Sequence, residues 1–171
     1  MVMVTHMQRE LPTRKGIRIK GYDYSSAGYY FVTICVKDKH DILWEEAGTV
    51  GARITRPLSD AGKTVKTAIE TIPKIYAAAD VVKYVIMPNH IHMIIVLQND
   101  ESGRVMRTPT ISTVINQMKG YVTKQLGYSL WQKLFYDEII KSEKAYQRIW
   151  QYIDENPARW AEDDYYSGPT A

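Results

Sequence analysis

The chain of 171 residues has one cysteine, Cys35, and it has no apolar run long enough to cross a membrane. A single cysteine excludes a disulfide framework and a cysteine-rich zinc site. Runs shorter than about 18 apolar residues argue against a transmembrane helix. The first residues also lack the layout of a signal peptide. We therefore expect one domain that is cytoplasmic and has no membrane partner.

The chain also lacks a large excess of charge of either sign, and it has very little phenylalanine. The 22 Lys and Arg residues almost balance the 19 Asp and Glu residues, so the net charge of +3 does not by itself indicate nucleic-acid binding. The aromatic residues are 13 Tyr and 4 Trp against 2 Phe, and these two types also serve at interfaces and in stacking on bases. Glycine motifs that cradle nucleotide phosphates are missing, so no nucleotide cofactor is expected.

The most informative stretch is 84–96, which reads Tyr-Val-Ile-Met-Pro-Asn-His-Ile-His-Met-Ile-Ile-Val. Its pattern predicts a strand over 81–87, a turn at Pro88 and Asn89, and a strand over 90–97. Side chains alternate along a strand, so His90 and His92 should share one face. Two imidazoles are too few for a closed structural zinc site. They suit an open metal site that has room for another ligand and a substrate.

The rest of the chain favours an α+β domain with an antiparallel sheet and helices packed on one face. Proline breaks helices, so Pro73 should stop the first helix, and Gly127 should follow the second. The remaining predicted elements are a strand over 29–36, a hairpin-like excursion over 42–57, helices over 59–72, 111–126 and 142–156, and an aromatic connector over 130–136.

We divide the chain into an N-terminal basic arm over 1–28, a catalytic domain over 29–160 and an acidic, aromatic tail over 161–171. Basic residues in two regions could contact phosphates, or they could simply be solvated. In the second region an aromatic ring would add base stacking to a groove for single-stranded DNA. The candidate DNA-binding residues are Arg14, Lys15, Arg18 and Lys20 in the arm, and Lys119, Lys124 and Trp131 in the domain. Lys133, Lys141, Phe135 and Tyr136 could belong to the same groove.

The last predicted helix offers what the histidine pair lacks. Tyr152 and Asn156 are four residues apart, so they lie on the same side of the helix, about 6 Å apart along its axis. They border its apolar stripe. An amide oxygen is a suitable ligand for Mg²⁺ or Mn²⁺, and a phenol oxygen can act as a nucleophile. Tyr121 and Gln125 have the same spacing one helix earlier and are a rival pair, although Gln125 falls nearer the centre of its apolar stripe.

Several segments together resemble a known family. The Pro-Asn-His-Ile-His segment resembles the histidine–hydrophobe–histidine signature of HUH endonucleases. With Tyr152-Ile153-Asp154-Glu155-Asn156-Pro157 downstream, the chain resembles the single-tyrosine transposases of insertion sequences, and among them the REP-associated tyrosine transposases. The resemblance extends over most of the chain, from residues 14–24 and 28–34 through Leu130-Trp131-Gln132 to the end of the last helix.

This resemblance implies a ferredoxin-like or RRM-like α+β fold and a metal-dependent transposase that acts on single-stranded DNA with hairpin structure. It implies that His90, His92 and Asn156 bind a divalent ion, Mg²⁺ or Mn²⁺. It also implies that Tyr152, rather than Tyr121, attacks a phosphodiester. That attack leaves a 5′-phosphotyrosine link and a free 3′-hydroxyl. Members of the family can act as homodimers.

Three other functions stay open on the sequence. The same sheet could be a nucleic-acid-binding module without catalysis, which would leave no covalent adduct on the protein. It could belong to a replication-initiator or relaxase nickase, which uses the same chemistry in another role. An unrelated zinc hydrolase would bind Zn²⁺ tightly and would not bind DNA.

Overall fold

The computed structural model describes residues 21–45, 57–99, 108–166 and 168, and its centre is a four-stranded antiparallel sheet in the order β2-β3-β1-β4. The predicted α+β class is confirmed. The strands are β1 (Gly28–Cys35), β2 (Ala79–Ile86), β3 (His90–Leu97) and β4 (Tyr136–Ile140). The helices are α1 (Asp60–Ile75), α2 (Ile111–Leu126) and α3 (Glu143–Glu155), with short 3-10 turns η1 (Lys37–Lys39) and η2 (Trp160–Glu162).

Strand β3 is central because both of its faces are apolar. All eight of its residues are buried, and it pairs with β1 on one side and β2 on the other. Strands that are covered on both faces read as continuous apolar runs, as this one does after His92. Pro88 and Asn89 make the tight turn from β2, which the Met87 backbone N–H closes by donating to the His90 carbonyl at 2.8 Å.

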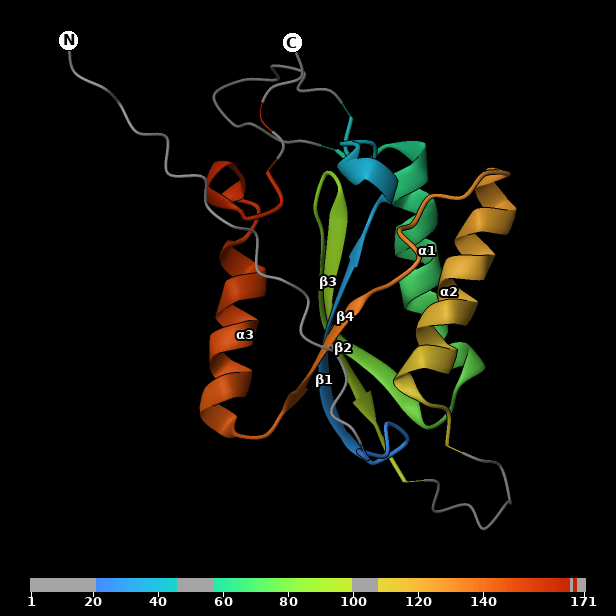
Figure 1. Ribbon diagram of the computed structural model, residues 1–171, viewed down its shortest axis with the longest axis vertical. Helices are drawn as coiled ribbons and strands as arrows, with labels where there is room; N and C mark the ends of the chain where they lie inside the picture. The colour runs from blue at the N-terminus through green and yellow to red at the C-terminus, as the bar shows by residue number, and fades with distance from the viewer. Residues whose placement is uncertain (1–20, 46–56, 100–107, 167, 169–171) are drawn as a thin grey trace, which may run out of the picture.

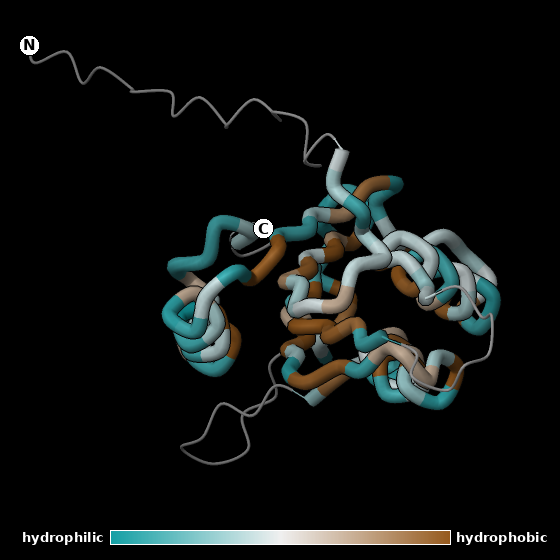
Figure 2. Tube along the Cα trace, turned by 90° about the horizontal axis from the view of Figure 1, so that it is seen from below, coloured by the Kyte–Doolittle hydropathy of each residue, from teal (hydrophilic) through white to brown (hydrophobic). Residues whose placement is uncertain are grey.

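Helices cover both faces of the sheet (Figures 1 and 2). Helices α1 and α2 pack on one face over the larger core. Helix α3 packs on the other face over a smaller cluster of four buried residues, Phe31, Ile94, Ile149 and Ile153. The expectation that the helices share one face is therefore wrong for α3. The physical reason is that β1 and β3 carry large apolar side chains on both faces, and an uncovered second face would expose them to water.

Hydroxyl side chains set the starts of the three helices. Ser59 accepts a hydrogen bond from the Gly62 backbone N–H, and Thr110 and Ser142 cap α2 and α3 in the same way. Helix α2 ends at Gly127, which adopts a left-handed φ of 76°. Pro73 does not stop α1, contrary to the prediction. It lies in the last turn on the exposed side, and the helix continues two residues beyond it to Ile75.

Strand β4 was not predicted. Its five residues include two acids and follow a connector rich in aromatic residues, so no clean alternation marks it. Among the described strands, β4 pairs only with β1 and forms an edge of the sheet. Most of the predicted excursion over 42–57 lies outside the described residues, and so do Arg14, Lys15, Arg18 and Lys20. Within the described ranges, no helix has both the length and the apolar character needed to cross a membrane.

Candidate active site

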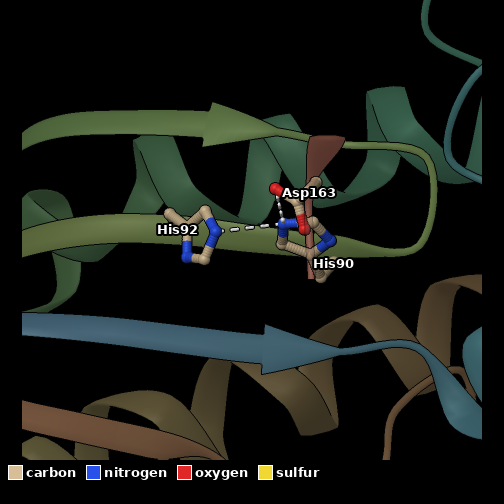
Figure 3. A group of neighbouring side chains, drawn as sticks. All are labelled: His90, His92 and Asp163. Atoms are coloured by element: carbon tan, nitrogen blue, oxygen red, sulfur yellow. Dashed lines mark hydrogen bonds and ion pairs between the residues drawn. The ribbon is translucent and has the colours of Figure 1, made fainter. Parts of the chain in front are cut away.

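His90 and His92 project from β3 on the face that α3 covers, and they point toward one another (Figure 3). Their Nε2 atoms are 3.0 Å apart, and the residues are 0% and 1% exposed. Two ligand atoms that each lie about 2.1 Å from one octahedral ion, at right angles, are about 3.0 Å apart. The two nitrogens are therefore spaced like neighbouring ligands of a single ion.

Asn89 fixes the tautomer of His90. The Nδ1 atom of His90 lies 2.9 Å from the amide oxygen of Asn89. The amide nitrogen of Asn89 in turn donates to the carbonyls of Lys39 and Tyr165, at 3.3 and 2.9 Å. Because the amide oxygen can only accept, His90 donates from Nδ1 and keeps its lone pair on Nε2. That is the tautomer that binds a metal ion through Nε2.

Thr33 gives His92 a choice of tautomers. Its hydroxyl lies 2.8 Å from His92 Nδ1, across the β1–β3 ladder. A hydroxyl can donate or accept, so His92 can carry its proton on either nitrogen. With the proton on Nε2, His92 can donate to His90 Nε2. With the proton on Nδ1, Thr33 accepts it and both Nε2 lone pairs are available to an ion.

Burial keeps both imidazoles neutral. It lowers the pKa of His92 to about 3. Burial, together with the neighbouring His92 and Lys39, lowers the pKa of His90 to about 2. A neutral ring offers the lone pair that a metal ligand needs, so the environment of the pair suits coordination at physiological pH.

A carboxylate that the sequence analysis did not select reaches the histidines (Figure 3). Asp163 follows η2, and its Oδ2 atom lies 3.9 Å from His90 Nε2. Potential ligand atoms of Asp163, His90 and His92 all lie within 4.8 Å of one another, so this trio could hold a metal ion. The Tyr165 backbone N–H donates to Asp163 Oδ1 at 2.7 Å and orients the carboxylate. The adjacent acids Asp163 and Asp164 were the one signal available in the sequence.

The segment that carries Asp163 also shields the histidines from water. The Tyr165 ring centroid lies 4.5 Å from that of His90 and 6.0 Å from that of His92. Trp160 is buried, and its ring lies 5.9 Å from His90. Residues 160–166 therefore pack on the site, although the sequence analysis placed most of them in a tail.

Tyr152 brings a phenol to the same place from α3. Its hydroxyl oxygen lies 3.2 Å from His92 Nε2, and the two ring centroids are 5.1 Å apart. Burial and then Asp163 raise the pKa of Tyr152 to about 12, against a smaller opposite effect from Asn156. The phenol is thus protonated at neutral pH, and it needs a nearby cation or base to act as a nucleophile.

Asn156 ends α3 with a buried amide. The residue is 4% exposed, and its Oδ1 atom has no hydrogen-bond partner among the described residues. Together with Tyr152 and Asp163 it lines a cavity of about 300 Å³. An unpaired buried oxygen is costly, and it is the kind of atom that a divalent cation binds. The donor set of imidazole, amide and carboxylate groups therefore fits such an ion.

The other predicted residues lie elsewhere. Tyr121 is on α2, which covers the opposite face of the sheet. Lys119 donates from Nζ to the carbonyls of Gln132 and Lys133, at 2.7 and 3.0 Å, and Lys124 is exposed in the last turn of α2. Trp131 is 5% exposed within the larger core, which leaves no ring face for base stacking, so that expectation is wrong.

Known proteins resemble this chain in sequence and in structure. No family model matches it. It is 32% identical over 185 residues to a Haemophilus influenzae protein described only as uncharacterized, and the match covers 96% of this chain and 99% of that protein.

Two solved structures are similar. A REP-associated tyrosine transposase bound to a REP hairpin has a TM-score of 0.59 and 19% identity, over 78% of this chain and 68% of that one. A Deinococcus radiodurans R1 protein, provisionally named a transposase, has a TM-score of 0.49 and 17% identity, over 84% and 97%. The first match shows a shared fold.

Proposed function

We propose that this chain, which belongs to one family with the Haemophilus influenzae protein and has the fold of a REP-associated tyrosine transposase, cleaves and rejoins single-stranded DNA as a metal-dependent transposase. One observation carries the proposal: the 3.2 Å contact between the Tyr152 hydroxyl and His92 Nε2, from residues 60 positions apart. This contact brings the proposed nucleophile next to the buried imidazole pair. The same arrangement is implied by the family resemblance of the segment with the two histidines and the segment with Tyr152.

A divalent ion would be held by His90 and His92 through their Nε2 atoms. Asn156 Oδ1 and Asp163 Oδ2 are the candidates for oxygen ligands from the protein, because one is buried without a partner and the other lies beside the pair. Mg²⁺ and Mn²⁺ both take such oxygens, but imidazole nitrogens favour Mn²⁺ because Mg²⁺ prefers oxygen alone. When bound, the ion would act as a Lewis acid on the scissile phosphate.

Tyr152 would attack the phosphorus of a phosphodiester. The bond from its Oη atom to phosphorus forms, and the bond from phosphorus to the 3′-oxygen breaks. The DNA is then joined to Tyr152 through a 5′-phosphate, and the leaving 3′-oxygen takes up a proton. With a pKa of about 12, only about one phenol in 10⁵ is ionised at pH 7, so loss of the phenol proton depends on positive charge nearby.

The covalent link would conserve the energy of the broken ester. A 3′-hydroxyl that attacks the phosphotyrosine reverses the step and rejoins DNA, so the reaction needs no nucleotide cofactor. We propose single-stranded DNA with a hairpin as the substrate, and the support is the similar structure solved with a REP hairpin.

End-labelled hairpin DNA tests the proposal. With Mn²⁺ the wild-type protein should give a shortened labelled strand and a covalent protein–DNA band. Tyr152→Phe should abolish both products while hairpin binding persists. Tyr121→Phe is the matched control, since it makes the same change on the other face of the sheet, and it should keep full activity. His90→Ala and His92→Ala should each lose metal-dependent cleavage.

Each failure has a distinct meaning. An adduct that survives Tyr152→Phe and disappears with Tyr121→Phe would reverse the assignment of the nucleophile. Cleavage that continues unchanged with a chelator would remove the metal from the mechanism. Hairpin binding by the wild type without any cleavage would favour a non-catalytic binding module.

A further inference from the structure

A pocket of about 370 Å³ lies where β1 leads into η1, and its lining residues are Lys37, Asp38, Gln132, Lys133 and Leu134. In Figure 1, η1 is at the same end of the sheet as the turn between β2 and β3 and as η2. Hydrogen bonds fix this neighbourhood. The Val36 N–H donates to the Asn89 carbonyl at 2.8 Å, and the Gln132 N–H donates to the Cys35 carbonyl at 2.9 Å.

The pocket is two strand spacings from the histidines. His90 pairs with Cys35 of β1 on one side, and Gln132 bonds to Cys35 on the other. Neighbouring strands are about 4.8 Å apart, so the backbone at the pocket lies about 10 Å from that of His90. An extended nucleic-acid strand with one phosphate at the histidines can reach the pocket with its neighbouring nucleotides.

The pocket carries a positive charge. Lys37 and Lys133 are exposed, and neither forms an ion pair with any residue in the described ranges, while Asp38 is the one acid among the lining residues. Lys119 of α2 does not line the pocket, but its Nζ donates to the backbone carbonyls of Gln132 and Lys133. This contact holds the connector that forms one wall of the pocket. The charge balance suits phosphate groups.

The backbone of η1 is strained. Asp38 and Lys39 both have positive φ angles, 57° and 56°, which residues other than glycine seldom adopt. Such strain costs on the order of 1 kcal/mol for each residue, and it persists where the surroundings over-determine the conformation, often at functional sites. Here the turn directs Lys37 to the pocket and sends Lys39 toward Tyr165, with its Nζ 5.4 Å from that ring.

An exposed aromatic ring lies on β4, close in sequence to the pocket and separated from the histidine strand by β1. Tyr136, two residues after Leu134, is 43% exposed at the start of β4. It pairs with Thr33, whose hydroxyl contacts His92. Paired residues share a face of the sheet, so Tyr136 is on the same face as the histidines. An exposed ring in this position can stack on a base.

We propose that Lys37, Lys133 and Tyr136 form a subsite for single-stranded DNA that holds the nucleotides next to the scissile phosphate. The lysines contact phosphates, and Tyr136 stacks on a base. The inference rests on the proposed function, because the strand must pass the histidines, but the subsite can be measured without cleavage.

Fluorescence anisotropy with labelled DNA tests the subsite. Binding is measured with a chelator present, at several salt concentrations, for one hairpin with a single-stranded flank and one without. The double variant Lys37→Gln/Lys133→Gln should bind the flanked hairpin roughly tenfold more weakly and lower the salt slope by about 1.4, which is about 0.7 for each lost phosphate contact. Tyr136→Ala should weaken the same complex roughly tenfold with little change in the slope.

The control makes the same charge change at a distance. Lys66 and Lys74 are exposed on α1, so Lys66→Gln/Lys74→Gln should leave flank binding within about twofold of wild type. An equal loss in this control, or an equal loss for the hairpin without a flank, would overturn the subsite. If the protein cleaves DNA but its Lys37, Lys133 and Tyr136 variants bind the flanked hairpin as tightly as wild type, the subsite alone is refuted. If binding of the flanked hairpin depends on these residues but the protein never forms an adduct, the subsite is supported and the catalytic proposal is refuted.

Discussion

Thr33→Val tests whether a single hydroxyl supports His92 as a ligand. Both residues are buried, and the 2.8 Å contact links the Thr33 hydroxyl to His92 Nδ1. Valine keeps the shape of the side chain and removes the hydroxyl, so Nδ1 is left buried without its partner. Such an unpaired polar atom costs about 1–3 kcal/mol. We expect the free energy of unfolding, measured in urea, to fall by that amount.

Binding of Mn²⁺ by the Thr33→Val protein should also weaken. A neutral His92 that binds through Nε2 carries its proton on Nδ1, and in the variant that proton would face a methyl group. Loss of a contact of this kind lowers metal affinity about 10- to 100-fold, which corresponds to about 1.4–2.7 kcal/mol. Isothermal titration calorimetry measures the change directly.

Thr33→Ser is the matched control. It keeps the hydroxyl and loses only a methyl group, so its affinity for Mn²⁺ should stay within about threefold of wild type. If folded Thr33→Val bound Mn²⁺ as tightly as wild type, the Thr33 hydroxyl would not support His92 as a metal ligand.

Three further predictions concern packing, α3 and pH. Gly62→Ala should destabilise the fold by about 1–3 kcal/mol because the added Cβ would overlap the Leu43 carbonyl oxygen. Gly120→Ala has open space on α2 and should stabilise the fold by about 0.5–1 kcal/mol. Urea unfolding measures both changes, and changes of the same sign would contradict the packing at Gly62. Lys83 forms an ion pair with Asp154, and its Nζ lies 4.5 Å from the centroid of the Trp150 ring. Lys83→Met should therefore lower the free energy of unfolding by about 1 kcal/mol. In a double-mutant cycle with Asp154→Asn, strictly additive effects would contradict the ion pair. Without metal, His90 and His92 should each lower stability by roughly 1 kcal/mol as the pH falls from 7 to 5.5, because the unfolded histidines bind protons near pH 6.5 and the folded ones do not. A pH dependence that is unchanged in His92→Asn would argue against a buried neutral imidazole.

Relations within one element could be predicted from the sequence. Strand alternation placed His90 and His92 on one face, and the helical period placed Tyr152 and Asn156 together. The docking of α3 over the histidines could not be derived in this way. Both central strands are apolar on both faces, so periodicity does not say which face a helix covers. That contact was implied only by the resemblance to a family.

The parts that were missed are held by tertiary contacts. Asp163 lies in a short polar segment without periodicity, and its place depends on Tyr165, whose ring packs on His90 and whose carbonyl accepts from Asn89. Trp131 was expected to stack on bases because aromatic composition does not distinguish a buried ring from an exposed one. Tyr136, which the sequence places in the same possible groove, is exposed on β4, a strand whose two acids hid its alternation.

Mapping of the covalent adduct tests the role of Tyr152 most directly. The protein is incubated with hairpin DNA and Mn²⁺, digested with a protease and a nuclease, and analysed by mass spectrometry. We predict one modified peptide, which contains Tyr152 linked to a 5′-phosphonucleotide and is absent when a chelator is added. A nucleotide attached to Tyr121 or to another residue, or no adduct under conditions in which the DNA is cleaved, would contradict the proposed mechanism.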